Sequence, residues 1–90
     1  MDLFVYFPPN LGIDRDYVEE SIQSVLGDIG EVTGGGAGQS GSNVDIEVFQ
    51  DIDIDRAIAL VSKLLISINA PGETLIVRGD TKQARLLRDL

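Results

Sequence analysis

The sequence predicts a single α+β domain whose elements follow the order β-α-β-β-α-β. Two segments, residues 14–26 and 53–68, carry apolar residues at helical spacing. Each is flanked by short apolar or alternating runs typical of strands, and a glycine-rich stretch joins the two middle runs. The 90 residues fall within the range of one domain, so the domain is expected to span residues 1–90.

The first strand and the first helix are bounded by proline and by capping residues. Residues 3–7 form a continuous apolar and partly aromatic run that stops at Pro8, which predicts a strand. Asp14 is placed to cap a helix that reaches about Leu26, and Gly27 suits the C-terminal cap. The apolar residues of this helix are Tyr17, Val18, Ile22, Val25 and Leu26.

A hairpin is expected in the middle of the chain. Residues 29–33 predict a second strand, and residues 43–50 predict a third because apolar and polar residues alternate from Val44 to Val48. Residues 34–42, between them, contain five glycines and two serines. We expect a long and flexible connection there rather than a tight turn.

The second helix and the last part of the chain follow similar signals. Asp51 or Asp53 is placed to cap a helix that ends before Pro71. Its apolar stripe consists of Ile54, Ala57, Ile58, Val61, Leu64, Leu65 and Ile68. A fourth strand is expected over residues 74–78. Asp80 then begins a capping-box pattern that permits a short C-terminal helix, and a frayed terminus is the alternative.

This element order is that of a ferredoxin-like fold, in which two helices cover one face of a four-stranded antiparallel sheet. Strand alternation should then separate side chains that face the helices from side chains on the open face. The set expected to face the helices is Leu3, Val5, Phe7, Val32, Val44, Ile46, Val48, Leu75 and Val77. The set expected on the open face is Phe4, Tyr6, Phe49 and Ile76, among Asp2, Glu31, Asp45 and Glu47, with Arg78 at one end.

Acidic residues outnumber basic ones along most of the chain. The sequence has fifteen Asp and Glu against seven Lys and Arg, for a net charge of -8, and only residues 78–90 are net basic. Such a chain repels phosphate backbones, so a nucleic-acid partner is not expected, whereas a basic protein partner is. The alternative is that the acidity only keeps a small protein soluble.

Cysteine and histidine are both absent. Their absence removes disulfides, thiolate chemistry, the commonest general base and the commonest metal ligand. We therefore expect no enzyme activity, no cofactor and no metal. No basic leader and no apolar run of about 20 residues occurs, so no membrane association is expected and the protein is predicted to be cytoplasmic.

Two motifs resemble ligand sites but have simpler structural explanations. Residues 36–41 match the pattern G-x-G-x-x-G, yet a strand rather than a helix is expected to follow, so the context for phosphate binding is missing. Asp51, Asp53 and Asp55 have the spacing of the first ligands of a calcium loop, but its sixth position holds Arg56 instead of glycine. Helix capping accounts for these aspartates.

Three segments of the middle of the chain carry a family resemblance. They are Gly-Glu-Val-Thr-Gly-Gly-Gly at residues 30–36, Val-Asp-Ile-Glu-Val at residues 44–48 and Asn-Ala-Pro-Gly-Glu-Thr at residues 69–74. With these segments the chain resembles a group of small bacterial ferredoxin-like proteins, some of which are similar to immunity proteins that neutralise secreted toxins. The motifs are structural, so the resemblance implies a class of function and carries over no active-site residue.

The sequence therefore predicts a non-catalytic binding protein, specifically an immunity-type or antitoxin-type inhibitor whose carboxylates occlude the cationic active site of a basic toxin. The expected partner-binding residues are Phe4, Tyr6, Glu31, Asp45, Glu47 and Phe49. An alternative interface consists of Asp16, Glu19 and Glu20 on the first helix. The alternative function is a structural or regulatory module that forms a homodimer through its open sheet face.

Overall fold

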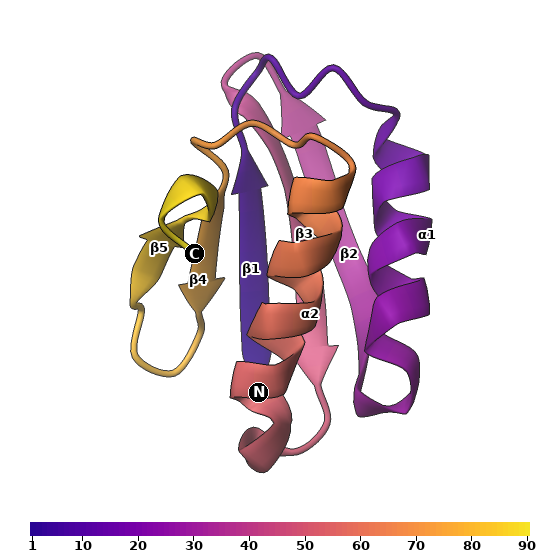
Figure 1. The fold of residues 1–90 in the computed structure, drawn as a ribbon, viewed down its shortest axis with the longest axis vertical. Helices are drawn as coiled ribbons and strands as arrows, with labels where there is room; N and C mark the ends of the chain where they lie inside the picture. Colours follow the sequence, from indigo (N-terminus) through magenta and orange to yellow (C-terminus); the bar gives the residue numbers. More distant parts are fainter.

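The computed structural model describes residues 1–90 as two layers, with both helices packed on one face of a five-stranded sheet (Figure 1). The helices are α1 (Arg15–Leu26) and α2 (Ile54–Ser67). The strands are β1 (Asp2–Phe7), β2 (Gly30–Gly38), β3 (Gly41–Val48), β4 (Leu75–Arg78) and β5 (Ala84–Leu86). Short 3-10 helices occupy Gly27–Ile29, Asp51–Asp53 and Leu87–Asp89. All neighbouring strands are antiparallel, in the order β2-β3-β1-β4-β5, which confirms the predicted α+β class.

The core lies between the sheet and the helices as one cluster of 15 buried apolar residues. Strand alternation supplies Leu3, Val5 and Phe7 from β1 and Val44, Ile46 and Val48 from β3. Helical spacing supplies Val18, Ile22 and Leu26 from α1 and Ile54, Ala57, Val61 and Leu65 from α2. Burial of a large apolar side chain stabilises the fold by about 1.5–3 kcal/mol, so this cluster is the main source of stability.

The predicted caps are confirmed at α1 but not at α2. Asp14 accepts a hydrogen bond from the Asp16 amide at 2.8 Å, and Gly27 ends α1 with a φ of 56° that glycine adopts without a steric cost. Asp53 precedes α2 but makes no capping hydrogen bond through its side chain. A 3-10 turn replaces the cap there, because the Ile54 amide donates to the Asp51 carbonyl oxygen.

The glycine-rich stretch forms paired strands instead of the predicted long loop. β2 continues to Gly38 and β3 begins at Gly41, which leaves only Gln39 and Ser40 as a turn. A bulge after Val32 shifts the register between the two strands. The prediction of a loop was wrong because it rested on the low strand propensity of glycine. Strands pair through backbone hydrogen bonds, which glycine forms as well as any other non-proline residue, so β2 and β3 continue through the glycines.

Gly35 is required where α1 approaches the hairpin. The Arg15 side chain passes over Gly35 and donates from Nη2 to the Asn43 carbonyl oxygen at 3.0 Å. A Cβ atom on Gly35 would collide with both the guanidinium and that carbonyl oxygen. Gly34 differs, since a Cβ atom added there would meet no atom within 4 Å.

One side chain of α1 covers part of the outer edge of β2. Gln23 Nε2 donates to the Gly30 carbonyl oxygen at 3.2 Å, and Gln23 Oε1 accepts from the Val32 amide at 2.9 Å. The side-chain amide thereby satisfies two backbone groups that no neighbouring strand pairs.

The chain after β4 forms a fifth strand where the sequence permitted a short C-terminal helix to begin, and only Leu87–Asp89 after this strand form a 3-10 turn. β5 lies antiparallel to β4, with Leu86 opposite Leu75. The turn between them is closed by the Lys82 amide, which donates to the Arg78 carbonyl oxygen at 2.9 Å. The Asp80 carboxylate binds the Arg78 side chain instead of capping a helix. The predicted four-stranded sheet therefore gains an edge strand that was not anticipated.

The facing of β4 is the reverse of the prediction. Ile76 lies opposite Val5 and is buried on the helix side, and Arg78 faces that side too. Leu75 and Val77 therefore point to the open face. Because three consecutive apolar residues show no alternation, the facing follows only from the pairing with β1, which the sequence pattern does not reveal.

Replacing Gly35 by alanine should destabilise the fold by about 1–3 kcal/mol, because the new Cβ atom must displace Arg15 or the backbone of β3. Gly34→Ala is the matched control, and we expect it to leave stability unchanged or to raise it by about 0.4–1 kcal/mol. Urea unfolding of the two variants measures the difference. Equal midpoints would show that the close approach at Gly35 has no energetic consequence.

Candidate functional site

The sheet face away from the helices carries three rows of side chains set by the strand register. The first row is Glu31, Glu47 and Asp2; the second contains Asp45, Phe4, Val77 and Ala84; the third contains Asn43, Tyr6, Leu75 and Leu86. Two regions result. The acidic half consists of Asp2, Glu31, Asp45 and Glu47, and the apolar half consists of Phe4, Tyr6, Leu75, Val77, Ala84 and Leu86.

The acidic half places carboxylates directly opposite one another. Glu47 lies opposite Glu31 on one side and opposite Asp2 on the other. Like charges in opposed positions destabilise a sheet. The N-terminal ammonium of Met1 lies 3.4 Å from Glu47 Oε1, whereas Asp2 and Glu31 form no ion pair. The row therefore retains negative charge that the fold itself does not neutralise.

The apolar half is centred on two aromatic side chains of β1. The rings of Phe4 and Tyr6 lie 6.4 Å apart between centroids, and Tyr6 remains 45% exposed. Leu75 and Val77 lie beside them on β4 and are only half-buried. A partner could therefore still remove apolar area from water here.

Most of the predicted partner-binding residues share this face. They are Phe4, Tyr6, Glu31, Asp45 and Glu47. Phe49 lies one residue past the end of β3 and is 53% exposed, and its amide donates to the Ile29 carbonyl oxygen at 3.0 Å. The alternative acids Asp16, Glu19 and Glu20 lie on α1, in the other layer of the molecule, and Glu19 forms an ion pair with Arg15 at 3.4 Å.

A groove of about 550 Å³, which we call the α2–β5 groove, lies on the helix side of the molecule. β4 and β5 extend past α2 (Figure 1), and the groove lies between α2 and this hairpin. Its walls include the apolar residues Ile58, Ile66 and Ile76 and the basic residues Lys63, Arg78 and Arg85. The sequence pattern does not reveal this groove, because one of its walls is the unpredicted strand β5. The one available signal was the basic character of residues 78–90.

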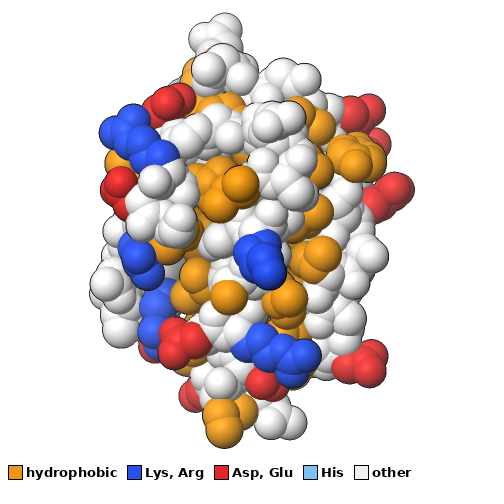
Figure 2. All heavy atoms as spheres, in the orientation of Figure 1, with side chains coloured by type: hydrophobic (Ala, Val, Ile, Leu, Met, Phe, Trp, Pro, Cys, Tyr) orange, Lys and Arg blue, Asp and Glu red, His pale blue; other side chains and the backbone are white.

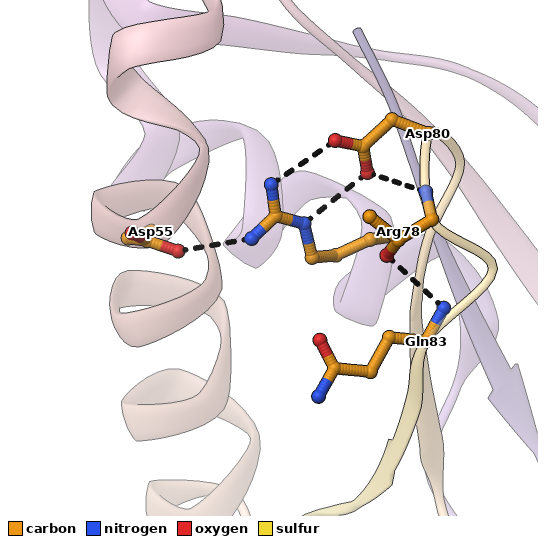
Figure 3. A network of polar contacts seen from close by, with 5 residues as sticks. Asp55, Arg78, Asp80 and Gln83 are labelled. Atoms are coloured by element: carbon orange, nitrogen blue, oxygen red, sulfur yellow. Dashed lines mark hydrogen bonds and ion pairs between the residues drawn. The ribbon is translucent and has the colours of Figure 1, made fainter.

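The Arg78 guanidinium ties the β4–β5 turn to α2 (Figure 3). Its Nε and Nη2 atoms donate to the two carboxylate oxygens of Asp80 at 3.2 and 3.1 Å, and Nη1 donates to Asp55 Oδ1 at 3.4 Å. The planar, forked donor geometry of arginine suits this bidentate contact. Arg78 therefore fixes the position of the hairpin that forms one wall of the groove.

The Arg78–Asp80 pair makes a pH-dependent contribution to stability. The hydrogen bond from Arg78 lowers the pKa of Asp80 below its ordinary value of 3.8, and the bond to Asp80 raises the pKa of Arg78. Because Asp80 binds its proton less readily when folded than when unfolded, the pair stabilises folding above pH 3.8. This contribution is lost as the pH falls through the lowered pKa of the folded state.

The other two cations of the groove are free of acidic partners. Lys63 on α2 and Arg85 on β5 form no ion pair, in contrast to Arg78. Figure 2 shows Lys and Arg side chains over α2 and over the β4–β5 side, with apolar surface between them. Basic side chains are thus concentrated on one flank of an otherwise acidic protein.

Comparison of the chain with protein-family models, with curated proteins and with solved structures finds no match. No group of three or more Asp and Glu side chains is arranged to hold a metal ion, and Asp51, Asp53 and Asp55 do not form one. Neither α1 nor α2 has the length and apolar character needed to cross a bilayer.

Replacing Arg78 by glutamine should raise the pKa of Asp80 toward 3.8, because the charged hydrogen-bond donor that stabilises the carboxylate is lost. A carboxyl-carbon NMR titration of both proteins measures this change. Arg88→Gln, which removes a positive charge from a residue that does not contact Asp80, is the control and should leave the Asp80 titration in place. An unchanged Asp80 pKa in Arg78→Gln would contradict the bidentate contact.

Proposed function

We propose that this protein is a non-catalytic binding protein that recognises a basic protein partner through its open sheet face. The observation that supports this proposal most directly is the row formed by Glu31, Glu47 and Asp2 next to exposed aromatic side chains. Opposed carboxylates cost folding stability, so their clustering is better accounted for by binding than by folding.

The two halves of the face contribute differently to binding. A cationic partner surface would relieve the repulsion within the acidic half and would be attracted to it over a distance, which raises the association rate. The apolar half would supply contact area, with Phe4 and Tyr6 as anchors, because aromatic side chains dominate the energetics of many interfaces. Charge thus directs the encounter, and the aromatic contact retains the partner.

Within this class, an immunity-type or antitoxin-type inhibitor fits best. Such a protein needs no catalytic group; it needs a surface complementary to the cationic active site of a toxin. The strand order β2-β3-β1-β4 with two helices on one face supports a ferredoxin-like arrangement to which β5 has been added, in line with the resemblance of residues 30–36 and 44–48. The lack of cysteine is compatible with a reducing bacterial cytoplasm.

A second candidate function is homodimerisation through the same face, and the apolar half is the observation that favours it. A two-fold interface would pair that patch with its own copy. The acidic half argues against a dimer centred on the whole face, because two copies would then bring eight carboxylates together.

The protein encoded immediately upstream of this chain provides the test of the immunity function. We expect that protein to arrest growth when it is expressed alone, and we expect co-expression of this chain to restore growth. An upstream product without toxicity, or toxicity that this chain does not relieve, would overturn the immunity assignment.

Two charge-matched variants locate the interface. D2N/E31Q/E47Q removes three carboxylates from the acidic half, and D16N/E19Q/E20Q removes three from α1. The first should abolish protection and slow association about tenfold or more at low salt, while leaving stability unchanged or raised by about 0.2–1 kcal/mol. The second should protect as the parent does. The reverse pattern would move the interface to α1.

Sedimentation equilibrium separates the two candidate functions. We expect a monomer at micromolar concentration, because a sheet face that is complementary to a basic partner is not complementary to a second copy of itself. A stable dimer that Tyr6→Ser dissociates would instead support the homodimer, since this substitution removes an aromatic anchor from the apolar half.

A further inference from the structure

The α2–β5 groove follows directly from the added strand. α2 and the sheet pack against each other over β1 and β3, but β4 and β5 continue the sheet beyond the helix (Figure 1). The chain end closes only one part of this space, where Leu87 is buried and its amide donates to the Thr74 carbonyl oxygen at 2.8 Å. A hollow of about 550 Å³ remains along the flank of α2.

The apolar lining of the groove comes from both walls. Ile58 and Ile66 lie two helical turns apart on one flank of α2 and supply most of this lining, whereas Ile76 of β4 adds only the 3% of its surface that remains exposed. Ile66 is 52% exposed. The Ser62 hydroxyl on the same flank already donates to the Ile58 carbonyl oxygen at 2.6 Å, so it adds no free donor. The lining can therefore contact a hydrocarbon or aromatic body.

The charges at the groove are opposite in sign to those of the protein. Three of the seven Lys and Arg residues line it, whereas Asp55 is the one acidic side chain among the lining residues. Arg78 is engaged by two carboxylates, but Lys63 and Arg85 have no ion-pair partner. Register places Arg85 opposite Ile76, so its side chain leaves β5 on the groove side. Two free cations on facing walls thus flank an apolar surface.

We propose that the α2–β5 groove binds a small organic anion, with an apolar body against Ile58, Ile66 and Ile76 and its anionic group held by Lys63 and Arg85. The groove volume lies within the range of about 300–1,000 Å³ typical of small-molecule sites. Nucleic acid is a poor occupant, because its affinity requires many phosphate contacts and the remainder of this chain is strongly acidic. This site is separate from the open sheet face and does not depend on the function proposed for that face.

A pair of fluorescent probes tests both parts of the proposal. 8-Anilinonaphthalene-1-sulfonate has an aromatic body and an anionic group, and N-phenyl-1-naphthylamine has the same body without the charge. We expect K63Q/R85Q to bind the sulfonate probe about two- to tenfold more weakly, because two ion pairs are lost, and to bind the neutral probe as the parent does. R56Q/K82Q removes the same charge from residues outside the groove and should bind both probes like the parent.

Three further measurements make the result decisive. Urea unfolding must show that K63Q/R85Q is as stable as R56Q/K82Q, since a partly unfolded chain also binds the sulfonate probe. Amide chemical shifts on probe addition should change at Ser62, Ile76 and Arg85 and not at Tyr6. Sodium octanoate should displace the sulfonate probe more effectively than octan-1-ol does.

Several outcomes would overturn the proposal. Equal affinity of the two double variants for the sulfonate probe would show that Lys63 and Arg85 hold no anion. Shifts confined to the open face would place the probe elsewhere. Displacement by a glutamate-rich peptide but not by octanoate would identify an acidic peptide as the occupant instead of a small molecule.

Discussion

The pairing of β1 on both of its edges is the constraint on which the rest of the structure depends. β3 and β4 both lie antiparallel to β1, and their registers decide which side chains face the helices. A slip of one residue would move Leu3, Val5 and Phe7 from the core to solvent, so burial of these residues holds the register. The same register sends Phe4 and Tyr6 outward and aligns the opposed carboxylates. The composition of the open face is therefore a direct consequence of how the core is filled.

The sequence predicted those parts of the fold that depend on periodicity. Alternation in β3, helical spacing in α1 and α2, and the cap at Asp14 all correspond to the structure. The sequence predicted β1 from an apolar run that ends at Pro8, and most of the predicted partner-binding residues do share one face. The facing of β4, the hairpin after Val32 and the strand β5 depend on pairing between distant segments, and pairing leaves no periodic signal in glycine-rich or uniformly apolar runs. The α2–β5 groove was missed for the same reason, since one of its walls is β5.

The two candidate surfaces lie on opposite sides of the sheet and carry opposite charge. The acidic half belongs to the open face, whereas Lys63, Arg78 and Arg85 gather on the helix side. The acidic half and the basic residues of the groove are therefore separated in the fold, which the net charge of -8 alone does not show. Under the functions proposed above, a basic partner on the open face would leave the α2–β5 groove accessible to its ligand. Arg78 connects the groove to the sheet, because its backbone belongs to β4 and its side chain reaches α2.

The contact between Gln23 and the edge of β2 bears on self-association. An edge strand with free N–H and C=O groups can pair with a strand of a second chain. β2 lies at one edge of the sheet and, with nine residues, is its longest strand. The Gln23 amide takes the place of a neighbouring strand at Gly30 and Val32, and the bulge that follows bends the remaining edge away from a straight template. A single side chain of α1 thus helps to prevent edge-to-edge polymerisation in a protein whose sheet exposes aromatic residues on its face.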